Sequence, residues 1–397
     1  MMTSTSANVC DRRDWRQSAS SGLPFQLTTT TLIMPAQYTL RVGFDARALC
    51  GERTGVGTYA ANLIEALLEI DRRISFFLVS AETLPVGPWS EDERVRTVVR
   101  RAGNGNNLVW TNVSLRGAIG REHIDVFHGP GYTRPFSLGI PSIVTLHDIC
   151  YAAAPQWYPY PSGFLRQAWY RRSTTGADAI LTVSEFSRRE IIRVYQVPAD
   201  KVHTIYHGVD RHRFFPLNSE EPIRELLGRY GLPADFLLFV GDVHPRRNIA
   251  RVIEAAHQVK VPLVVVGRVM DSTKPAEHPD VRFLGYVPET DLPVLYNAAR
   301  ALVYPSFYEG FGFPILEAMA CGCPVIVSRG TACEETAGDA GLKVDPTSVK
   351  ALAEAIGGIL HNRDVAVRLS EAGLKRAKHF DWRKTAEETL KVYRQVK

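Results

Sequence analysis

The sequence predicts an α/β protein with two doubly wound domains, in each of which helices cover both faces of a parallel sheet. The chain has 397 residues, and one core seldom grows past about 250–300 residues, so two domains are expected. Short β-branched runs alternate with amphipathic stretches along the chain. Many of these runs are apolar throughout, which is typical of strands buried on both faces of a parallel sheet.

Composition excludes several classes of protein. Hydrophobic residues make up 45% of the chain and charged residues 22%, which argues against a disordered, a collagen-like or a multi-span membrane protein. The net charge of +5 suits an anionic substrate or an anionic membrane surface, and it is too small to indicate a nucleic-acid partner. No run approaches the roughly 18 apolar residues of a membrane span.

The cysteines and the N-terminus predict a cytoplasmic protein. Six cysteines are too few for a disulfide framework, and a single residue separates Cys321 from Cys323, fewer than in a zinc knuckle. We therefore expect reduced thiols, no metal and no cofactor. Residues 1–34 are rich in Ser, Thr and Arg without the apolar segment of a secretory signal. They are predicted to be a disordered extension.

Two series of apolar runs define the domains. The runs of the first series are Leu40–Phe44, Phe76–Val79, Val95–Val99, Ile124–His128, Ser142–His147, Ala179–Val183 and Val202–Tyr206. Those of the second are Phe236–Val240, Pro262–Gly267, Val281–Leu284, Ala301–Tyr304 and Pro324–Val327. Between the first two runs, Val56–Leu68 has the apolar spacing of an amphipathic helix. The alternation of strands and helices predicts layered α/β domains.

The series is interrupted over residues 207–222, where Pro, Gly and charged residues follow no strong period. This segment is the predicted domain boundary. We expect an N-terminal domain over residues 35–214 and a C-terminal domain over residues 215–380. Residues 381–397 are predicted to form a final helix whose apolar side packs back on the N-terminal domain.

The sharpest motif is EGFGFPILE, which runs from Glu309 to Glu317 after the predicted strand Ala301–Tyr304. Gly310 and Gly312 allow a close approach of the backbone to a ligand. Pro314 suits the first turn of a helix, whose free N–H groups form an anion site. Each of the two carboxylates can bind a diol. The alternative interpretation is a glycine-rich loop with two solvated glutamates.

Together with the following ACGCPVI (320–326), this motif resembles the retaining glycosyltransferases of family 4. The resemblance covers about residues 40–397 and implies the GT-B fold, in which two Rossmann-like domains face each other across a cleft. It implies transfer of a hexose from a nucleotide-diphospho-sugar with retention at the anomeric carbon, and no bound cation. Glu309 would hold sugar hydroxyls as a catalytic residue, and Glu317 would bind the ribose. The backbone at Gly310, Phe311 and Gly312 would bind the donor.

The loop TGVGTY (54–59) is similar to the family's N-terminal glycine-rich loop. The resemblance implies that Gly57 contacts the donor diphosphate and that Gly55 contacts the acceptor. The alternative is a plain helix-start turn. A dinucleotide fingerprint would need its glycines directly after the strand, whereas Gly55 lies eleven residues beyond Phe44 (55 − 44). This spacing disfavours an oxidoreductase.

Two further motifs carry polar residues after strands. In SIVTLHD (142–148), His147 corresponds to a family histidine beside the reacting sugar, and we expect it to donate a hydrogen bond to a hydroxyl or phosphate. Asp148 would orient His147 or bind acceptor hydroxyls. His128 also ends a strand and is predicted to be structural. A buried His147 held by a carbonyl is the alternative.

In VGDVHPRRN (240–248), Arg247 takes the place of a family lysine and Arg246 lies beside it. Guanidinium groups bind phosphate well, so Arg247 is predicted to be catalytic and Arg246 to bind the donor. Asp242 stands where many members have arginine, which removes one expected donor contact. Gly285 belongs to VRFLGYV (281–287), which resembles the segment that lines the nucleotide base.

The predicted partners are a nucleotide-diphospho-sugar and a glycan or lipid-linked acceptor of cell-surface polysaccharide synthesis, such as lipopolysaccharide. Likeness to mannosyltransferase-like members at TLHDI (145–149) and PRRN (245–248) favours GDP-mannose. Aromatic and basic residues alternate over 156–172, as in a peripheral contact with the inner membrane, an acceptor groove or a core helix. A GT-B-type sugar-nucleotide epimerase and a non-catalytic sugar-nucleotide-binding protein remain alternatives.

Overall fold

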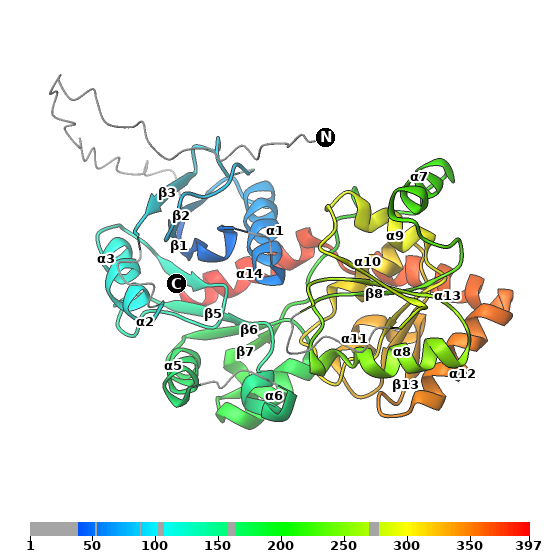
Figure 1. Cartoon of the computed structure of the whole chain (residues 1–397). Helices are drawn as coiled ribbons and strands as arrows, with labels where there is room; N and C mark the ends of the chain where they lie inside the picture. The colour runs from blue at the N-terminus through cyan, green and yellow to red at the C-terminus, as the bar shows by residue number, and fades with distance from the viewer. Residues whose placement is uncertain (1–38, 52–53, 88, 102–106, 158–162, 270–277) are drawn as a thin grey trace, which may run out of the picture. The chain divides into compact units, whose positions relative to one another are not determined.

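A computed structural model describes residues 39–51, 54–87, 89–101, 107–157, 163–269 and 278–397. The predicted N-terminal extension lies outside these residues. The chain forms two parallel sheets (Figure 1). The strand order is β3-β2-β1-β4-β5-β6-β7 in the first sheet and β10-β9-β8-β11-β12-β13 in the second. Both are doubly wound, which confirms the predicted fold class.

The first sheet consists of strands that all pair in parallel. They are β1 (Leu40–Asp45), β2 (Ile74–Ser80), β3 (Val95–Val99), β4 (Val126–Gly129), β5 (Ser142–Leu146), β6 (Ala179–Thr182) and β7 (Val202–Thr204). Its helices are α1 (Gly55–Ile70), α2 (Asn107–Val109), α3 (Arg116–Ile119), α4 (Cys150–Ala153), α5 (Phe164–Thr175) and α6 (Glu185–Tyr195).

The second sheet is built in the same way from β8 (Leu237–Val240), β9 (Leu263–Val266), β10 (Val281–Gly285), β11 (Ala301–Tyr304), β12 (Val325–Ser328) and β13 (Gly341–Val344). The helices after β7 are α7 (Glu221–Tyr230), α8 (Ile249–Gln258), α9 (Asp291–Ala298), α10 (Phe313–Ala320), α11 (Ala332–Ala337), α12 (Val349–His361), α13 (Arg363–Ala377) and α14 (Trp382–Val396). Each predicted run forms a strand, and β13 was not predicted because GLKV is not a continuous apolar run.

Alternate residues of the central strands pack on opposite faces of the second sheet. Leu238 and Val240 of β8 belong to a core with α9 and α10. Leu237 and Phe239 belong to a second core with α8 and α12. Burial on both faces explains why the sequence of this strand is apolar at every position.

The final helix α14 packs against α1 of the first sheet (Figure 1). Ala386, Leu390 and Tyr393 lie in the same buried cluster as the apolar side chains of α1. The Tyr393 hydroxyl is also 2.6 Å from Nδ1 of His128, at the end of β4. The amphipathic pattern of the last residues therefore has its partner at the opposite end of the chain.

Strand order places several loops at one edge of each sheet. In the second sheet the order reverses between β8 and β11, which are neighbours. The loop after β8 carries Arg246 and Arg247, and the loop after β11 carries Glu309. Ligands of doubly wound sheets bind at the carboxyl ends of strands where the order reverses. The fold therefore brings these three side chains to a ligand-binding position.

Candidate active site

A cavity of about 310 Å³ brings together most of the predicted site residues. We call it the Glu309 cavity. Its walls come from the loop before α1, the ends of β4 and β5, the segment after β7, and the loops after β8 and β11. The predicted residues that line it are Gly55, His147, Asp148, Arg246, Arg247, Glu309, Gly310, Phe311 and Gly312.

Two arginines hold the carboxylate of Glu309. Arg247 Nε donates to Glu309 Oε1 at 3.1 Å, and Arg246 Nη1 lies 3.5 Å from Oε2. The Tyr304 hydroxyl also donates to Oε1, at 3.1 Å. Arg247 reaches back to the carbonyl of Asp242 at 3.1 Å, so both ends of its guanidinium are fixed. The result is a rigid, largely buried cluster of charge.

The charges in this cluster determine its protonation. Burial alone would raise the pKa of Glu309, but Arg246, Arg247 and the hydroxyl of Tyr304 outweigh burial and hold it below its ordinary value. Burial would likewise lower the pKa of Arg246, but the carboxylates of Glu309 and Asp148 raise it. Glu309 is therefore an anion at neutral pH and both arginines are cations.

His147 directly follows β5, and its Nε2 lies 2.9 Å from the carbonyl oxygen of Pro130. Because a carbonyl can only accept, Nε2 carries the proton and Nδ1 is the acceptor of the neutral ring. Burial lowers the pKa of His147 to about 4. Nδ1 is therefore the ring atom left to face a ligand, as an acceptor, and the predicted contact of His147 with a substrate hydroxyl or phosphate stays a prediction.

The two carboxylate oxygens of Asp148 have partners other than His147, and its predicted role in binding acceptor hydroxyls stays a prediction. Its Oδ1 accepts from the backbone N–H of Cys150 at 3.0 Å, and its Oδ2 accepts from Arg246 Nη1 at 3.2 Å. It therefore ties the end of β5 in the first sheet to the arginine loop that follows β8. His147 is oriented by the Pro130 carbonyl instead of by this carboxylate.

His207 lines the same cavity and was not predicted. Only 1% of the residue is exposed, and its Nδ1 has no hydrogen-bond partner among the described residues. The ring stacks on Phe313 at 4.7 Å and lies 5.5 Å from the ring of His147. Burial lowers its pKa well below the ordinary value. His207 lies in the segment that links the two sheets, outside every recognised motif, so the sequence alone did not indicate it.

Glu317 lies in a neighbouring cavity of about 260 Å³, which we call the Glu317 cavity. Phe313 borders both cavities. The Tyr296 hydroxyl donates to Glu317 Oε2 at 2.8 Å. Burial raises the pKa of Glu317 to about 7, although the bond from Tyr296 opposes this shift. The walls include Gly241, Asp242, Gly267, Tyr286, Val287 and Glu289.

The predicted glycines have different places. Gly57 lines neither cavity, and its N–H donates to Thr54 Oγ1 at 3.3 Å. A Cβ there would clash with the Ala48 carbonyl, so this glycine permits close packing of the loop, and its predicted phosphate contact stays a prediction. Gly285 also lines neither cavity, although the next residue, Tyr286, lines the Glu317 cavity.

Gly310 packs closely against the backbone of His147. A Cβ at this residue would clash with the carbonyl of His147. Gly312 has a φ of 98° and precedes the first residue of α10, a conformation that favours glycine. These two glycines therefore shape the wall of the Glu309 cavity by bringing the loop after β11 against the end of β5.

Asp242, which stands where many family members have arginine, forms an ion pair with Arg268 at 3.1 Å. Both residues lie at the rim of the second sheet, after β8 and β9, and Asp242 lines the Glu317 cavity. Arg268, on the neighbouring strand end, is thus the partner of the Asp242 carboxylate.

A third cavity, the Asp45 cavity, lies in the first sheet and shares Val56 and Tyr132 with the Glu309 cavity. The Asp45 carboxylate accepts from Arg47 Nη2 at 2.6 Å, and Arg47 also donates to the amide oxygen of Asn107. Trp169 and Tyr170 form part of the wall. Aromatic faces beside charged and amide groups are suited to binding a polar ring.

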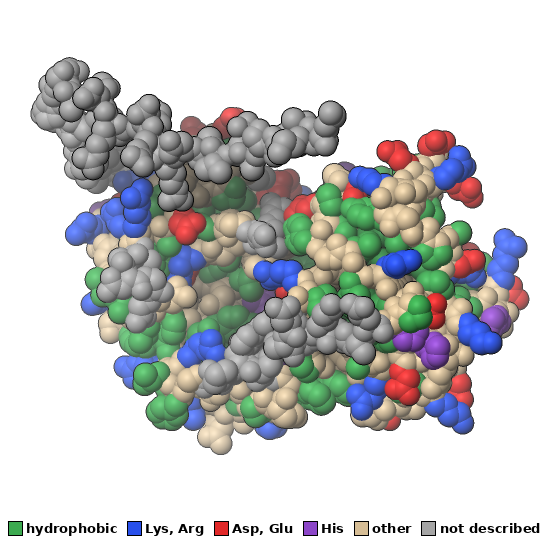
Figure 2. Space-filling model, viewed as in Figure 1, with side chains coloured by type: hydrophobic (Ala, Val, Ile, Leu, Met, Phe, Trp, Pro, Cys, Tyr) green, Lys and Arg blue, Asp and Glu red, His purple; other side chains and the backbone are tan. Residues whose placement is uncertain are grey.

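The surface carries several exposed apolar side chains among charged ones. Figure 2 shows Lys and Arg side chains scattered among Asp and Glu on the visible face rather than gathered in one patch. At the start of α5, Phe164 is 83% and Leu165 is 78% exposed, whereas Trp169 in the same helix is buried. Among the described helices, none has the length and apolar character needed to cross a bilayer.

Comparison with known proteins agrees with this geometry. The family profile "Glycosyltransferase Family 4" matches residues 53–213, and "Glycosyl transferases group 1" matches residues 231–376. An O-antigen chain mannosyltransferase B of Escherichia coli is 36% identical over 293 residues, which cover 69% of this chain and 75% of that protein. The serotype-specific mannosyltransferase WbdA of Escherichia coli is 29% identical over 53% of this chain and 28% of its own.

The fold is shared with solved structures. The sucrose-phosphate synthase of Thermosynechococcus elongatus superposes with a TM-score of 0.71 at 22% identity, covering 90% of this chain and 98% of that one. The matched family profiles cover strands β2 to β13 and the loops that carry Glu309, Arg247 and His147. The chain therefore belongs to the family 4 glycosyltransferases and has their GT-B fold.

Proposed function

We propose that the protein transfers mannose from GDP-mannose, with retention at the anomeric carbon, to a glycan or lipid-linked acceptor of cell-surface polysaccharide. The observation that carries the proposal is the cluster of Arg246, Arg247 and Glu309 in the Glu309 cavity. It joins two cations, an anion and the first turn of α10 at the point where the strand order of the second sheet reverses.

The arginines are suited to stabilise a leaving diphosphate. Departure of a nucleoside diphosphate builds negative charge on its phosphate oxygens, and fixed positive groups stabilise that charge in the transition state. Arg246 and Arg247 supply two charges, and the free N–H groups at the start of α10, which begins at Phe313, add a partial one. These groups can carry the step without a bound cation.

Glu309 is suited to the sugar. Its carboxylate is ionised and fixed, so it can accept hydrogen bonds from sugar hydroxyls and support positive charge on the ring in an oxocarbenium-like transition state. A bound sugar would then donate to the same carboxylate that accepts from Arg247. His147 offers an acceptor, Nδ1, to a further hydroxyl.

The proton balance favours retention. The carboxylates that line the cavity, Glu309 and Asp148, are both paired with Arg246. With its low pKa, His147 is a weak base, and an efficient base has a pKa near the working pH. A phosphate oxygen of the leaving group, which stays on the side from which it departed, can accept the proton of the incoming hydroxyl. Attack on that same side retains the anomeric configuration.

The Glu317 cavity is suited to the nucleoside. Glu317 can accept from the ribose hydroxyls, and the exposed ring of Tyr286 together with Val287 can face the base. Gly285 would act through the turn that places Tyr286, whereas Gly241 and Gly267 form the close backbone wall. Because backbone and apolar contacts suit any base, support for guanine and for mannose comes from the similar O-antigen mannosyltransferases.

The acceptor side is the first sheet. A Cβ at Gly55 would have no other atom within 4 Å, so the backbone of this residue is open to the Glu309 cavity. The Asp45 cavity adjoins it through Val56 and Tyr132, and can take a further sugar ring of an extended acceptor. Exposed Phe164 and Leu165, with the nearby Arg166, are suited to a peripheral contact with an anionic cytoplasmic membrane face.

The test is a panel of nucleotide sugars, read by thermal unfolding and then by turnover. A ligand that binds only the folded state raises the melting temperature, so we expect GDP-mannose to raise it most. In the turnover assay, we expect GDP-mannose to be consumed when a mannosylated acceptor is supplied. An altered sugar released without an acceptor would indicate the epimerase, and binding without turnover would indicate a non-catalytic protein. If a UDP-sugar were the only donor turned over, the assignment of GDP-mannose as donor would be wrong, and the assignment as a transferase would stand.

A further inference from the structure

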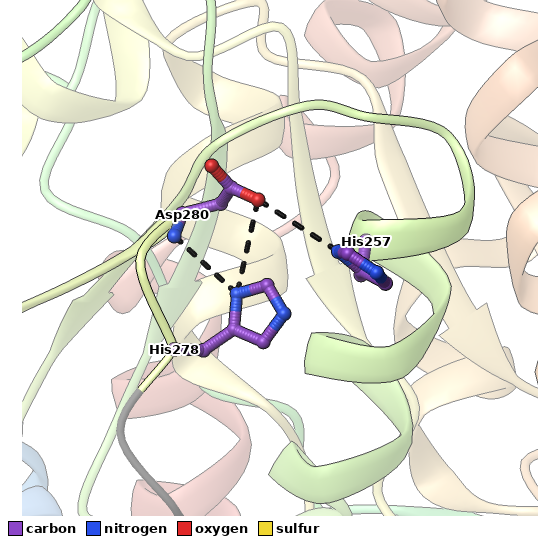
Figure 3. A group of neighbouring side chains, drawn as sticks. All are labelled: His257, His278 and Asp280. Carbon is purple, nitrogen blue, oxygen red and sulfur yellow. Dashed lines mark hydrogen bonds and ion pairs between the residues drawn. The ribbon is translucent and has the colours of Figure 1, made fainter.

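A group of two histidines and an aspartate lies at an edge of the second sheet (Figure 3). His257 is near the end of α8, and His278 and Asp280 directly precede the edge strand β10. Asp280 Oδ2 lies 3.7 Å from Nδ1 of His257 and 3.8 Å from Nδ1 of His278. The ligand atoms of the three side chains all lie within 4.8 Å of one another. Among the described residues, no other group of three or more His, Cys, Asp or Glu side chains has this spacing.

The ligand atoms suit one class of metal. Two imidazoles and one carboxylate are typical of Zn²⁺ and related transition metals, whereas Mg²⁺ and Ca²⁺ prefer oxygen ligands throughout. With metal–ligand bonds of about 2.0–2.2 Å, tetrahedral ligand atoms lie roughly 3.3–3.6 Å apart. The two observed distances from Asp280 exceed this spacing by only a few tenths of an ångström, and the exposed side chains of His257 and Asp280 can close the gap.

Backbone contacts hold the three residues in register. The carbonyl of Asp280 accepts from the N–H of Leu263 at 2.8 Å, which fixes it to β9. The N–H of Asp280 donates to Nδ1 of His278 at 3.3 Å, so this nitrogen carries no proton, and its lone pair would turn from this hydrogen bond to the metal. His257 follows Ala255 and Ala256, which are buried in the core beneath α8.

The charge around the group also favours a cation. The ion pairs of Asp280 within the described residues are those to the two histidines, so no described lysine or arginine neutralises it. His257 and Asp280 side chains are 63% and 50% exposed, which leaves room for water as the remaining ligand. None of the three residues lines the Glu309, Glu317 or Asp45 cavity.

We propose that His257, His278 and Asp280 form a zinc-type metal site that ties the end of α8 to the edge strand β10. The metal would add coordinate bonds between elements that the His257–Asp280 ion pair already joins, and would therefore stabilise this side of the second sheet. Because the site lies outside the reaction cavities, transfer would not pass through the metal.

The test uses the full chain, stripped with a chelator and dialysed, and Zn²⁺ alone as the probe. We expect calorimetry to show one equivalent of Zn²⁺ bound and thermal unfolding to show a raised melting temperature. Co²⁺ at the same site should give the visible absorption of a tetrahedral complex. His257→Ala and Asp280→Asn should each lose binding, the temperature shift and the absorption.

His361→Ala is the matched control, because His361 is exposed on α12 and lies outside the group. This variant should bind Zn²⁺ as the unaltered chain does. Circular dichroism of each variant verifies folding before the titration. Equal Zn²⁺ binding by the unaltered chain and by His257→Ala would overturn the proposal, and so would failure of the unaltered chain to bind Zn²⁺. Neither result depends on the sugar donor.

Discussion

At the scale of single residues, Arg247 is the side chain on which the proposed chemistry depends most. Its guanidinium is fixed between Glu309 and the Asp242 carbonyl, and is thus preorganised for a developing charge. We expect Arg247→Ala to lower kcat by roughly 100- to 1000-fold, as is typical when one such group is removed. Arg247→Lys keeps the charge without the fork geometry and should lose less. Near-normal turnover in the alanine variant would place the charge stabilisation on Arg246 or on α10.

Glu317 gives a prediction about pH. Because burial raises its pKa to about 7, the carboxylate loses its charge as pH falls from 8 to about 6. An ionised carboxylate accepts ribose hydroxyls better than a protonated one, so the KM for the donor should rise as pH falls over this range. Glu317→Gln should have a raised KM that no longer changes with pH there. A pH dependence of KM that is equal in both proteins would assign the titration to another group.

The unpaired nitrogen of His207 predicts a substrate contact. Buried polar groups in native proteins are normally hydrogen-bonded, and His207 lines the Glu309 cavity with Nδ1 unpartnered in the described structure. His207→Phe keeps the stack on Phe313 and removes both nitrogens. We expect kcat/KM to fall roughly tenfold, about 1–1.5 kcal/mol for one hydrogen bond, with a melting temperature close to that of the unaltered chain. Unchanged kinetics would make the ring a packing group only.

At the scale of elements, the docking of α14 depends on a buried polar chain. The His128 ring lies between Tyr393 of α14 and Thr145 of β5, with Nε2 at 2.7 Å from Thr145 Oγ1. Tyr393→Phe leaves Nδ1 of His128 unpaired in the core, which costs about 1–3 kcal/mol. Denaturant unfolding should show this loss. Tyr286→Phe, at an exposed tyrosine, is the control, and an equal change in both variants would contradict the role of the buried bond.

Elements with strong local patterns were predictable, and contacts between distant segments were not. Continuous apolar runs predicted every strand except β13, and Pro314 predicted the start of α10. The place of Arg246 and Glu309 in a common cavity followed from strand ends. By contrast, the packing role of Gly57 depends on Ala48, and the partner of Asp148 is an arginine that follows it by 98 residues. No local pattern encodes such pairs.

The site histidines show the same limit at close range. His147 was recognised by its position at a strand end, but its tautomer is set by the carbonyl of Pro130. His207 was missed because burial and an unpaired nitrogen are properties of the folded chain. His257 precedes His278 by 21 positions (278 − 257) in the sequence, and only the pairing of β9 with β10 brings His278 and Asp280 near α8.

At the scale of the whole molecule, metal and transfer are predicted to be separate. The arginines of the Glu309 cavity can stabilise the leaving group, so turnover of the donor should survive EDTA at moderate temperature. The same treatment should remove the Zn²⁺-dependent rise in melting temperature. Loss of turnover in EDTA with recovery in Mn²⁺ would show that the cavity needs a cation, and would contradict the role given to Arg246 and Arg247.

The most direct test of the central claim is a transfer assay with GDP-mannose labelled in the sugar, a mannosylated acceptor and EDTA, run in parallel on the unaltered chain and Arg247→Ala. The account predicts label in the acceptor, one GDP released for each mannose transferred, and a roughly 100- to 1000-fold lower rate in the variant. Label that stays on the donor with every nucleotide sugar tried, or equal rates in the two proteins, would contradict the claim that this cavity transfers a hexose through Arg247.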